Sequence, residues 1–139
     1  MSARALFTEW LTFLASEKRA SPRTVRAYGD DVERWLDFLM RHLGTAPDAE
    51  ALKTLSAGDL RAFLASRRGE GLSARSLART LASVRAFHRF LERRKSIANA
   101  ALMQVAAPKQ PRTLPRPLAA DAARQTLVEA GATGRGLSG

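Results

Sequence analysis

Apolar residues recur three and four positions apart along most of the first 95 residues, and this pattern constrains the fold more than any other feature of the sequence. Such spacing gathers apolar side chains on one side of an α-helix, where they can face a core. The longest stripe runs from Ser73 to about Lys95. Its apolar side consists of Leu77, Leu81, Val84, Phe87, His88 and Leu91. No segment alternates apolar and polar residues over a useful length, as a half-buried strand does. The sequence therefore predicts an all-α fold, a compact bundle of four or five helices.

Capping residues indicate where the predicted helices begin and end. Ser21 is a typical N-cap because Pro22 follows it at the first helical position, and Gly44 is a typical helix stop. Ser56 and Asp59 have the spacing of a capping box. The helices predicted in this way cover residues 6–18, 22–41, 56–69, 73–95 and, as a short one, 99–105. Residues 45–52 have weak periodicity, so we expect a loop there with room for one short turn.

The chain of 139 residues, 45% of them hydrophobic, has the size of one folded domain plus a tail. Residues 108–117 contain four prolines, which exclude a helix and favour an extended linker. Residues 118–139 have few apolar residues and end in a glycine-rich stretch. We therefore expect a helical domain over 1–107, a proline-rich linker over 108–117, and a flexible, disordered segment over 118–139 in which the chain stops inside a second domain.

Positive charge is concentrated in one predicted helix. The chain has 23 Lys and Arg against 13 Asp and Glu, a formal net charge of +10. Residues 72–95 contain seven of these cations and only one carboxylate, Glu92. On a helical wheel, the arginines at 75, 79, 89 and 93 gather opposite the apolar stripe, with Ala82 and Ala86 between them. Such a face suits a DNA groove, and its alternative is a solvated outer face. This assignment predicts that replacing Arg75 or Arg79 by alanine weakens DNA binding with little loss of fold.

The predicted helix over 22–41 carries its unbalanced positive charge at its start. Arg23, Thr24 and Arg26 lie in its first turn and a half, whereas acidic residues balance the later arginines. Free backbone N–H groups and the helix dipole favour a phosphate at such an end. In the alternative interpretation, Ser21 and Thr24 only cap the helix and Arg23 is solvated.

Several function classes are excluded or disfavoured by the sequence. The chain has no cysteine, which excludes thiolate nucleophiles, zinc ribbons and iron–sulfur sites. His42 and His88 lack the neighbours of a metal or catalytic site, and Tyr28 lies on an apolar stripe, so packed or surface positions are expected. We predict no cofactor, no metal and no catalysis by this chain. The start of the chain is not a secretory signal and no membrane segment is present, so we expect a cytoplasmic protein.

Four segments carry a family resemblance through their order and spacing. They are Ser21–Tyr28, Trp35–Leu39, Gly71–Leu91, and Pro108–Lys109 followed by Leu114–Leu118. Together they resemble the N-terminal core-binding domain of tyrosine recombinases, most closely the XerC/XerD type, over about residues 5–118.

The resemblance implies a SAM-like helical domain that covers one face of double-stranded DNA while a separate C-terminal domain cuts and rejoins the strands. The implied partners are duplex DNA and, for the longer protein, other recombinase subunits on the same site. Together with the basic face and the linker, it makes DNA-binding candidates of Arg23, Thr24, Arg26, Arg75, Ser76, Arg79, Arg85, Arg89, Lys109, Arg112 and Arg116.

In this family the catalytic Arg, Lys, His and Tyr set belongs to the C-terminal domain, which would only be starting at Gly139. No catalytic residue is therefore assigned, and the implied role of the longer protein is the resolution of chromosome dimers. Two alternatives remain open, namely the DNA-binding domain of a phage or transposon integrase and a basic helical module that binds an acidic protein.

Overall fold

The computed structural model describes residues 1–106, which form six α-helices and no strand. The helices are α1 (Ala3–Ser16), α2 (Pro22–Leu43), α3 (Ala49–Thr54), α4 (Ala57–Gly69), α5 (Ala74–Lys95) and α6 (Ala100–Met103). This confirms the predicted all-α bundle. The predicted linker at 108–117 and the segment 118–139 lie outside the described residues.

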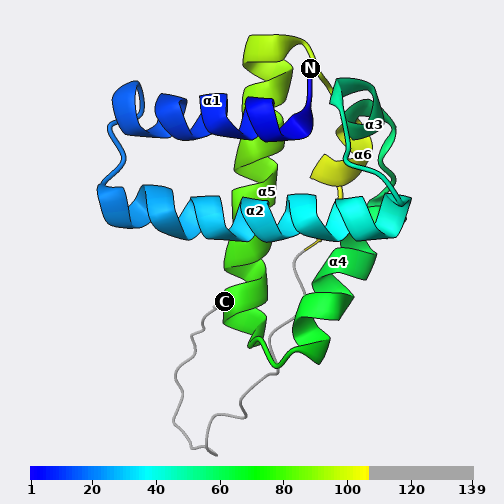
Figure 1. Cartoon of the computed structure of the whole chain (residues 1–139). Helices are drawn as coiled ribbons and strands as arrows, with labels where there is room; N and C mark the ends of the chain where they lie inside the picture. The colour runs from blue at the N-terminus through cyan, green and yellow to red at the C-terminus, as the bar shows by residue number, and fades with distance from the viewer. Residues whose placement is uncertain (107–139) are drawn as a thin grey trace, which may run out of the picture. The chain divides into compact units, whose positions relative to one another are not determined.

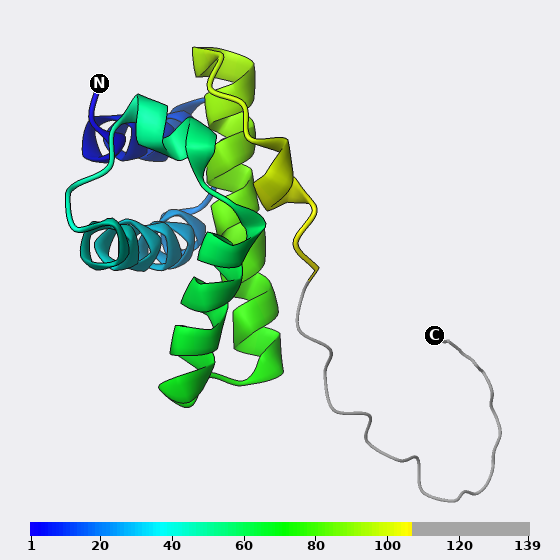
Figure 2. The ribbon, with the colours of Figure 1, turned by 90° about the vertical axis from the view of Figure 1, so that its right-hand side faces the viewer.

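Helix α5 is the central element of the domain. In Figure 1, α1 and α2 run side by side in opposite directions and both cross α5. Helix α4 lies along the N-terminal half of α5. Figure 2 shows that α6 lies on the side of α5 away from α1 and α2. This arrangement covers α5 with other helices on several sides and leaves part of its length for solvent.

Aromatic residues from four helices form the centre of the core. Trp10 of α1 packs edge-on against Phe87 of α5, with ring centroids 5.4 Å apart. Trp35 of α2 lies 5.2 Å from Phe63 of α4 by the same measure. All six members of the apolar stripe predicted for residues 73–95 are buried, with exposures of 3% or less. The core therefore follows the hydrophobic periodicity of the sequence.

The predicted caps are confirmed by their hydrogen bonds. The Ser21 hydroxyl accepts a hydrogen bond from the Thr24 backbone N–H at 3.1 Å. Ser56 and Asp59 form the reciprocal capping box, with distances of 3.1 and 2.7 Å. Gly44 ends α2 with a φ of 82°, a left-handed conformation that glycine adopts without strain.

The prediction of a loop over residues 45–52 is wrong in part, because α3 begins at Ala49. Asp48 caps this helix by accepting a hydrogen bond from the Ala51 backbone N–H at 2.9 Å. Leu52 and Leu55 are buried at its end, with exposures of 0% and 4%. A helix of six residues has too few positions to show periodicity, and it is stabilised here by its cap and by burial against other helices.

Candidate nucleic-acid interface

The start of α2 is exposed and carries only positive charge. Arg23, Thr24 and Arg26 are all exposed, and the first turn contains no acidic residue. The Ser21 hydroxyl caps the helix and also donates a hydrogen bond to the Thr24 hydroxyl at 3.0 Å. Capping and phosphate binding are compatible here, because the two arginines stay in solvent beside the positive end of the helix dipole.

The exposed side of α5 carries the basic face that the wheel predicts. Arg75, Arg79, Arg89 and Arg93 are exposed, and the first turn of α5 contains no acidic residue. Ser76 is half-buried, and its backbone N–H donates to the hydroxyl of Ser73, the N-cap, at 3.1 Å. We call Arg75, Arg79, Arg89 and Arg93 the basic face of α5.

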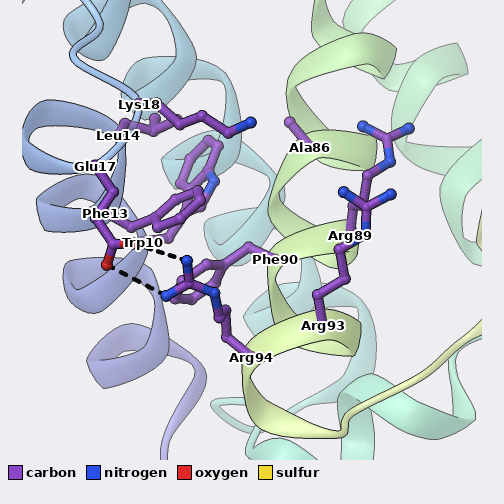
Figure 3. A pocket seen from close by; sticks show the side chains of 10 residues that line it. All are labelled: Trp10, Phe13, Leu14, Glu17, Lys18, Ala86, Arg89, Phe90, Arg93 and Arg94. Carbon is purple, nitrogen blue, oxygen red and sulfur yellow. Dashed lines mark hydrogen bonds and ion pairs between the residues drawn. The ribbon is translucent and has the colours of Figure 1, made fainter.

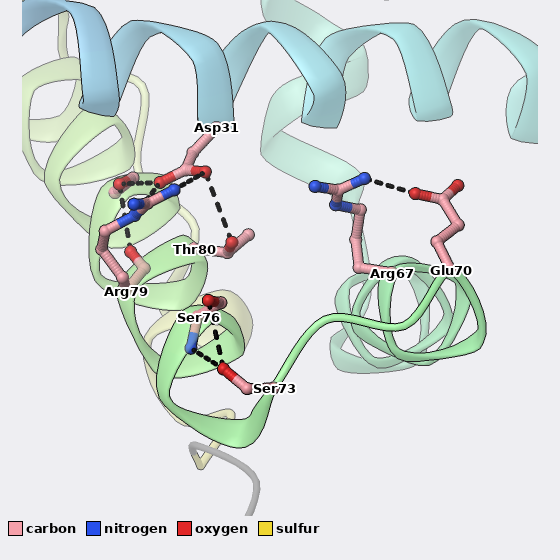
Figure 4. A network of polar contacts seen from close by, with 8 residues as sticks. Asp31, Arg67, Glu70, Ser73, Ser76, Arg79 and Thr80 are labelled. Carbon is pink, nitrogen blue, oxygen red and sulfur yellow. Dashed lines mark hydrogen bonds and ion pairs between the residues drawn. The ribbon is translucent and has the colours of Figure 1, made fainter.

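Arg79 also belongs to a buried polar network, shown in Figure 4. Its Nε and Nη2 atoms donate to the two carboxylate oxygens of Asp31 on α2, each at 3.1 Å. Asp31 is only 2% exposed, and it accepts two further hydrogen bonds, from the Ser83 hydroxyl at 2.8 Å and the Thr80 hydroxyl at 3.4 Å. These bonds and the carboxylate charge stabilise the guanidinium cation and raise the pKa of Arg79. Arg79 therefore joins α2 to α5, so Arg79→Ala removes a contact within the fold as well as a charge from the basic face.

Local sequence patterns do not identify Asp31 as a functional residue, because it is one of several acidic residues that balance the later arginines of α2. A signal was present in the spacing, because Asp31 lies three residues after Tyr28 and four before Trp35, on the apolar stripe itself. An acidic residue at a core position of a helix indicates a buried partner elsewhere in the fold.

Arg85, another predicted contact residue, is not brought together with the basic face. Its side chain is half-buried and its Nη2 atom donates to the backbone carbonyl of Val105, which follows α6. Arg85 therefore ties α5 to the segment after α6. Lys109, Arg112 and Arg116, the remaining predicted contacts, lie outside the described residues.

A pocket of about 370 Å³ between α1 and α5 extends the positive surface (Figure 3). Lys18, Arg89 and Arg93 lie at its rim. Glu17 is engaged by Arg94 through two hydrogen bonds, of 2.7 and 3.2 Å. Lys18 comes from the residues that follow α1, so its place beside α5 is a consequence of tertiary packing that no local pattern showed.

The histidines and the tyrosine have structural positions, as predicted. His88 is 3% exposed and its Nε2 atom accepts a hydrogen bond from Trp35 Nε1 at 3.1 Å. Burial disfavours its charged form and lowers the pKa of His88 to about 4. His42 pairs with Asp59 at 2.9 Å. Tyr28 is half-buried, with its ring stacked against Trp10 at a centroid distance of 6.4 Å.

Neither a membrane span nor a metal-ligand cluster occurs within residues 1–106. No helix there is long and apolar enough to cross a bilayer. Within the same residues, no group of three or more His, Cys, Asp or Glu side chains could hold a metal ion.

The chain is similar in sequence to a known protein family. Residues 7–95 match the family described as "Phage integrase, N-terminal SAM-like domain". The chain is similar to the tyrosine recombinase XerC of Mesorhizobium japonicum, with 46% identity over 118 residues, which is 85% of this chain and 38% of that protein. The XerC of Methylobacterium nodulans is 50% identical over 114 residues, 82% of this chain and 35% of that protein. The XerC of Brucella suis is 44% identical over 119 residues, 86% of this chain and 38% of that protein.

The chain thus spans less than two fifths of the length of these relatives. No solved structure matches it. The family match covers all of the four long helices except the first four residues of α1, and it includes both the start of α2 and the whole basic face of α5. The chain belongs to the family of phage integrase N-terminal SAM-like domains.

Proposed function

We propose that residues 1–106 are the domain of a site-specific tyrosine recombinase that binds duplex DNA. The observation that carries this proposal is the basic face of α5, whose four arginines are exposed on the side opposite the buried stripe. Guanidinium groups bind phosphates and guanine edges, and a row of them along one exposed helix face is typical of a helix that lies in a DNA groove. The relatives named tyrosine recombinase support the same partner.

In this proposal helix α5 approaches the DNA groove, and the start of α2 binds the sugar–phosphate backbone beside that groove. Ala82 and Ala86 lie between the arginines of the basic face, and their short side chains allow the helix to come close to DNA. Arg23, Thr24 and Arg26 bind a phosphate beside the first turn of α2. Arg85 contributes charge from a position tied to Val105. Lys109, Arg112 and Arg116 contact the backbone from the linker at 108–117, and residues 118–139 begin the catalytic domain.

The described domain positions DNA and does not cleave it. Its one tyrosine, Tyr28, is half-buried with its ring stacked against Trp10, which is a packing position and not that of an exposed nucleophile. Incubation of the chain with a nicked suicide duplex should leave no covalent protein–DNA adduct. An adduct that disappears in Tyr28→Phe would contradict this assignment.

A salt titration of binding to duplex DNA tests the proposal. Neutralising about five or six phosphates gives a slope of log K against log salt of about −5. Arg75→Ala should lower the affinity and flatten the slope by about 1. Arg61→Ala, which removes the same charge from the exposed side of α4, is the matched control and should change neither. Affinity that does not depend on salt, or equal effects of the two variants, would contradict the proposal and favour an acidic protein as the partner.

A further inference from the structure

We infer that Asp31 is a positioning residue that holds Arg79 so that the outer edge of its guanidinium group reads a guanine in the major groove. This inference rests on the proposed DNA-binding function and adds the base that the site recognises. Asp31 itself does not touch DNA, because it is buried between α2 and α5 (Figure 4).

The carboxylate of Asp31 is fixed in place by its hydrogen bonds. It receives two from Arg79 and one each from the hydroxyls of Thr80 and Ser83. Thr80 and Ser83 are both 0% exposed and lie on α5, the helix that carries Arg79. The carboxylate therefore has one orientation, and the guanidinium plane bonded to it has one orientation as well.

The geometry leaves the useful edge of Arg79 open. A guanidinium group has five N–H donors, and the Asp31 carboxylate accepts one hydrogen bond from Nε and one from Nη2. Three donors remain, on Nη1 and on the far side of Nη2, where two parallel N–H bonds point away from Asp31. The Arg79 side chain is 55% exposed, so these donors can reach a ligand. Two parallel donors match the O6 and N7 acceptors of guanine.

Charge favours a base edge over a phosphate at this position. The buried carboxylate compensates the Arg79 cation, so its attraction for a phosphate is weaker than that of Arg75, which has no ion-pair partner among residues 1–106. A hydrogen bond to a neutral guanine edge depends on direction more than on net charge. Because its rotamer is already fixed, Arg79 also loses less side-chain freedom on binding than an unpaired arginine.

The test is selection from a randomised duplex library with the 139-residue chain, followed by affinity measurements on the enriched duplex. Wild type should enrich a guanine, and replacing that guanine with another base should weaken binding by about 5- to 150-fold. A 7-deazaguanine at that position, which lacks the N7 acceptor, should weaken binding as well. Both penalties should shrink in Asp31→Asn and in Arg79→Lys, since lysine keeps the charge but lacks the planar pair of donors.

Two controls separate positioning from a structural role. Ser83→Ala removes the hydroxyl that donates to Asp31 and to the backbone carbonyl of Arg79, but it leaves both hydrogen bonds between the Arg79 guanidinium group and Asp31. It should therefore keep the guanine preference. Asp31→Asn should bind a duplex of random sequence at low salt at least as tightly as wild type does, because it removes a negative charge. Circular dichroism shows whether each variant is folded. If Asp31→Asn does not fold, the guanine preference of Arg79→Lys tests the inference.

Two results would overturn the inference. If Arg79→Lys keeps the full guanine preference, or if wild type has none, Arg79 contacts a phosphate or no DNA at all. If Asp31→Asn lowers binding to all duplexes equally and keeps the preference, Asp31 only stabilises the fold. Failure of the proposed function itself gives a different result, since wild type would then bind no duplex at low salt.

Discussion

Replacing His88 should flatten the dependence of stability on pH in the mildly acidic range. His88 is buried beside Trp35, Phe87 and the rest of the α5 stripe, and its Nε2 atom accepts a hydrogen bond from Trp35 Nε1 at 3.1 Å. Protonation of Nε2 would break this bond and place a charge in the core. The pKa of His88 is therefore lowered from 6.5 to about 4 by burial.

The sign and size of the effect follow from linkage between protonation and folding. In the unfolded chain the imidazole takes up a proton as the pH falls through 6.5, whereas in the folded chain it does so only near pH 4. The stability contributed by the neutral histidine is present above pH 6.5 and is lost as the pH falls toward 4. Between pH 7 and pH 5 the free energy of unfolding should drop by about 2 kcal/mol through this group alone.

Urea unfolding followed by tryptophan fluorescence at a series of pH values measures this drop. His88→Gln is the test variant because its side-chain oxygen can accept from Trp35 Nε1 and does not titrate. Hydrogen bonds lower the pKa values of Asp59 and Glu17, so these carboxylates lose their contribution to the free energy of unfolding only below about pH 4.5. The change between pH 7 and pH 5 is therefore assigned to His88. His42→Gln controls for the exposed histidine. If His88→Gln keeps the wild-type slope between pH 7 and pH 5, the description of a buried neutral His88 is wrong.

Three further substitutions test the described fold. Arg79→Ala should lower the free energy of unfolding by about 1–3 kcal/mol because it leaves the buried carboxylate of Asp31 without its cation. The control, Arg75→Ala, should change the free energy of unfolding by less than about 0.5 kcal/mol. Equal losses for the two variants in urea unfolding would contradict the ion pair. Leu81→Ala, at a position 1% exposed, should cost about 2–5 kcal/mol by leaving a cavity, and a smaller loss in the same melts would remove Leu81 from the core. Gly44→Ala should cost about 1 kcal/mol through its φ of 82° alone, since a Cβ there meets no atom within 4 Å; an unchanged thermal midpoint would mean that α2 ends differently.

Features that depend on neighbours along the chain could be predicted from the sequence. The caps at Ser21, Ser56 and Ser73 act on backbone groups three residues away, so the residues that make them are visible in one short segment. Periodicity likewise separates the buried side of α5 from its basic face, because both sides repeat within a single helix. Helix α3 could not be predicted in this way, since its burial depends on residues elsewhere in the chain.

The partners of individual polar side chains were decided by the tertiary structure. Asp31 and Arg79 are 48 residues apart, and Trp35 and His88 are 53 apart. An aspartate on a helix has the same local pattern whether it faces water or a buried arginine, and only the crossing of α2 over α5 distinguishes the two. The sequence by itself therefore determined every described helix except α3, and it determined that one of them presents a row of cations. Which of those cations has no ion-pair partner within residues 1–106, and which is held by a buried carboxylate, was decided only by the packing that brings distant residues within hydrogen-bond distance.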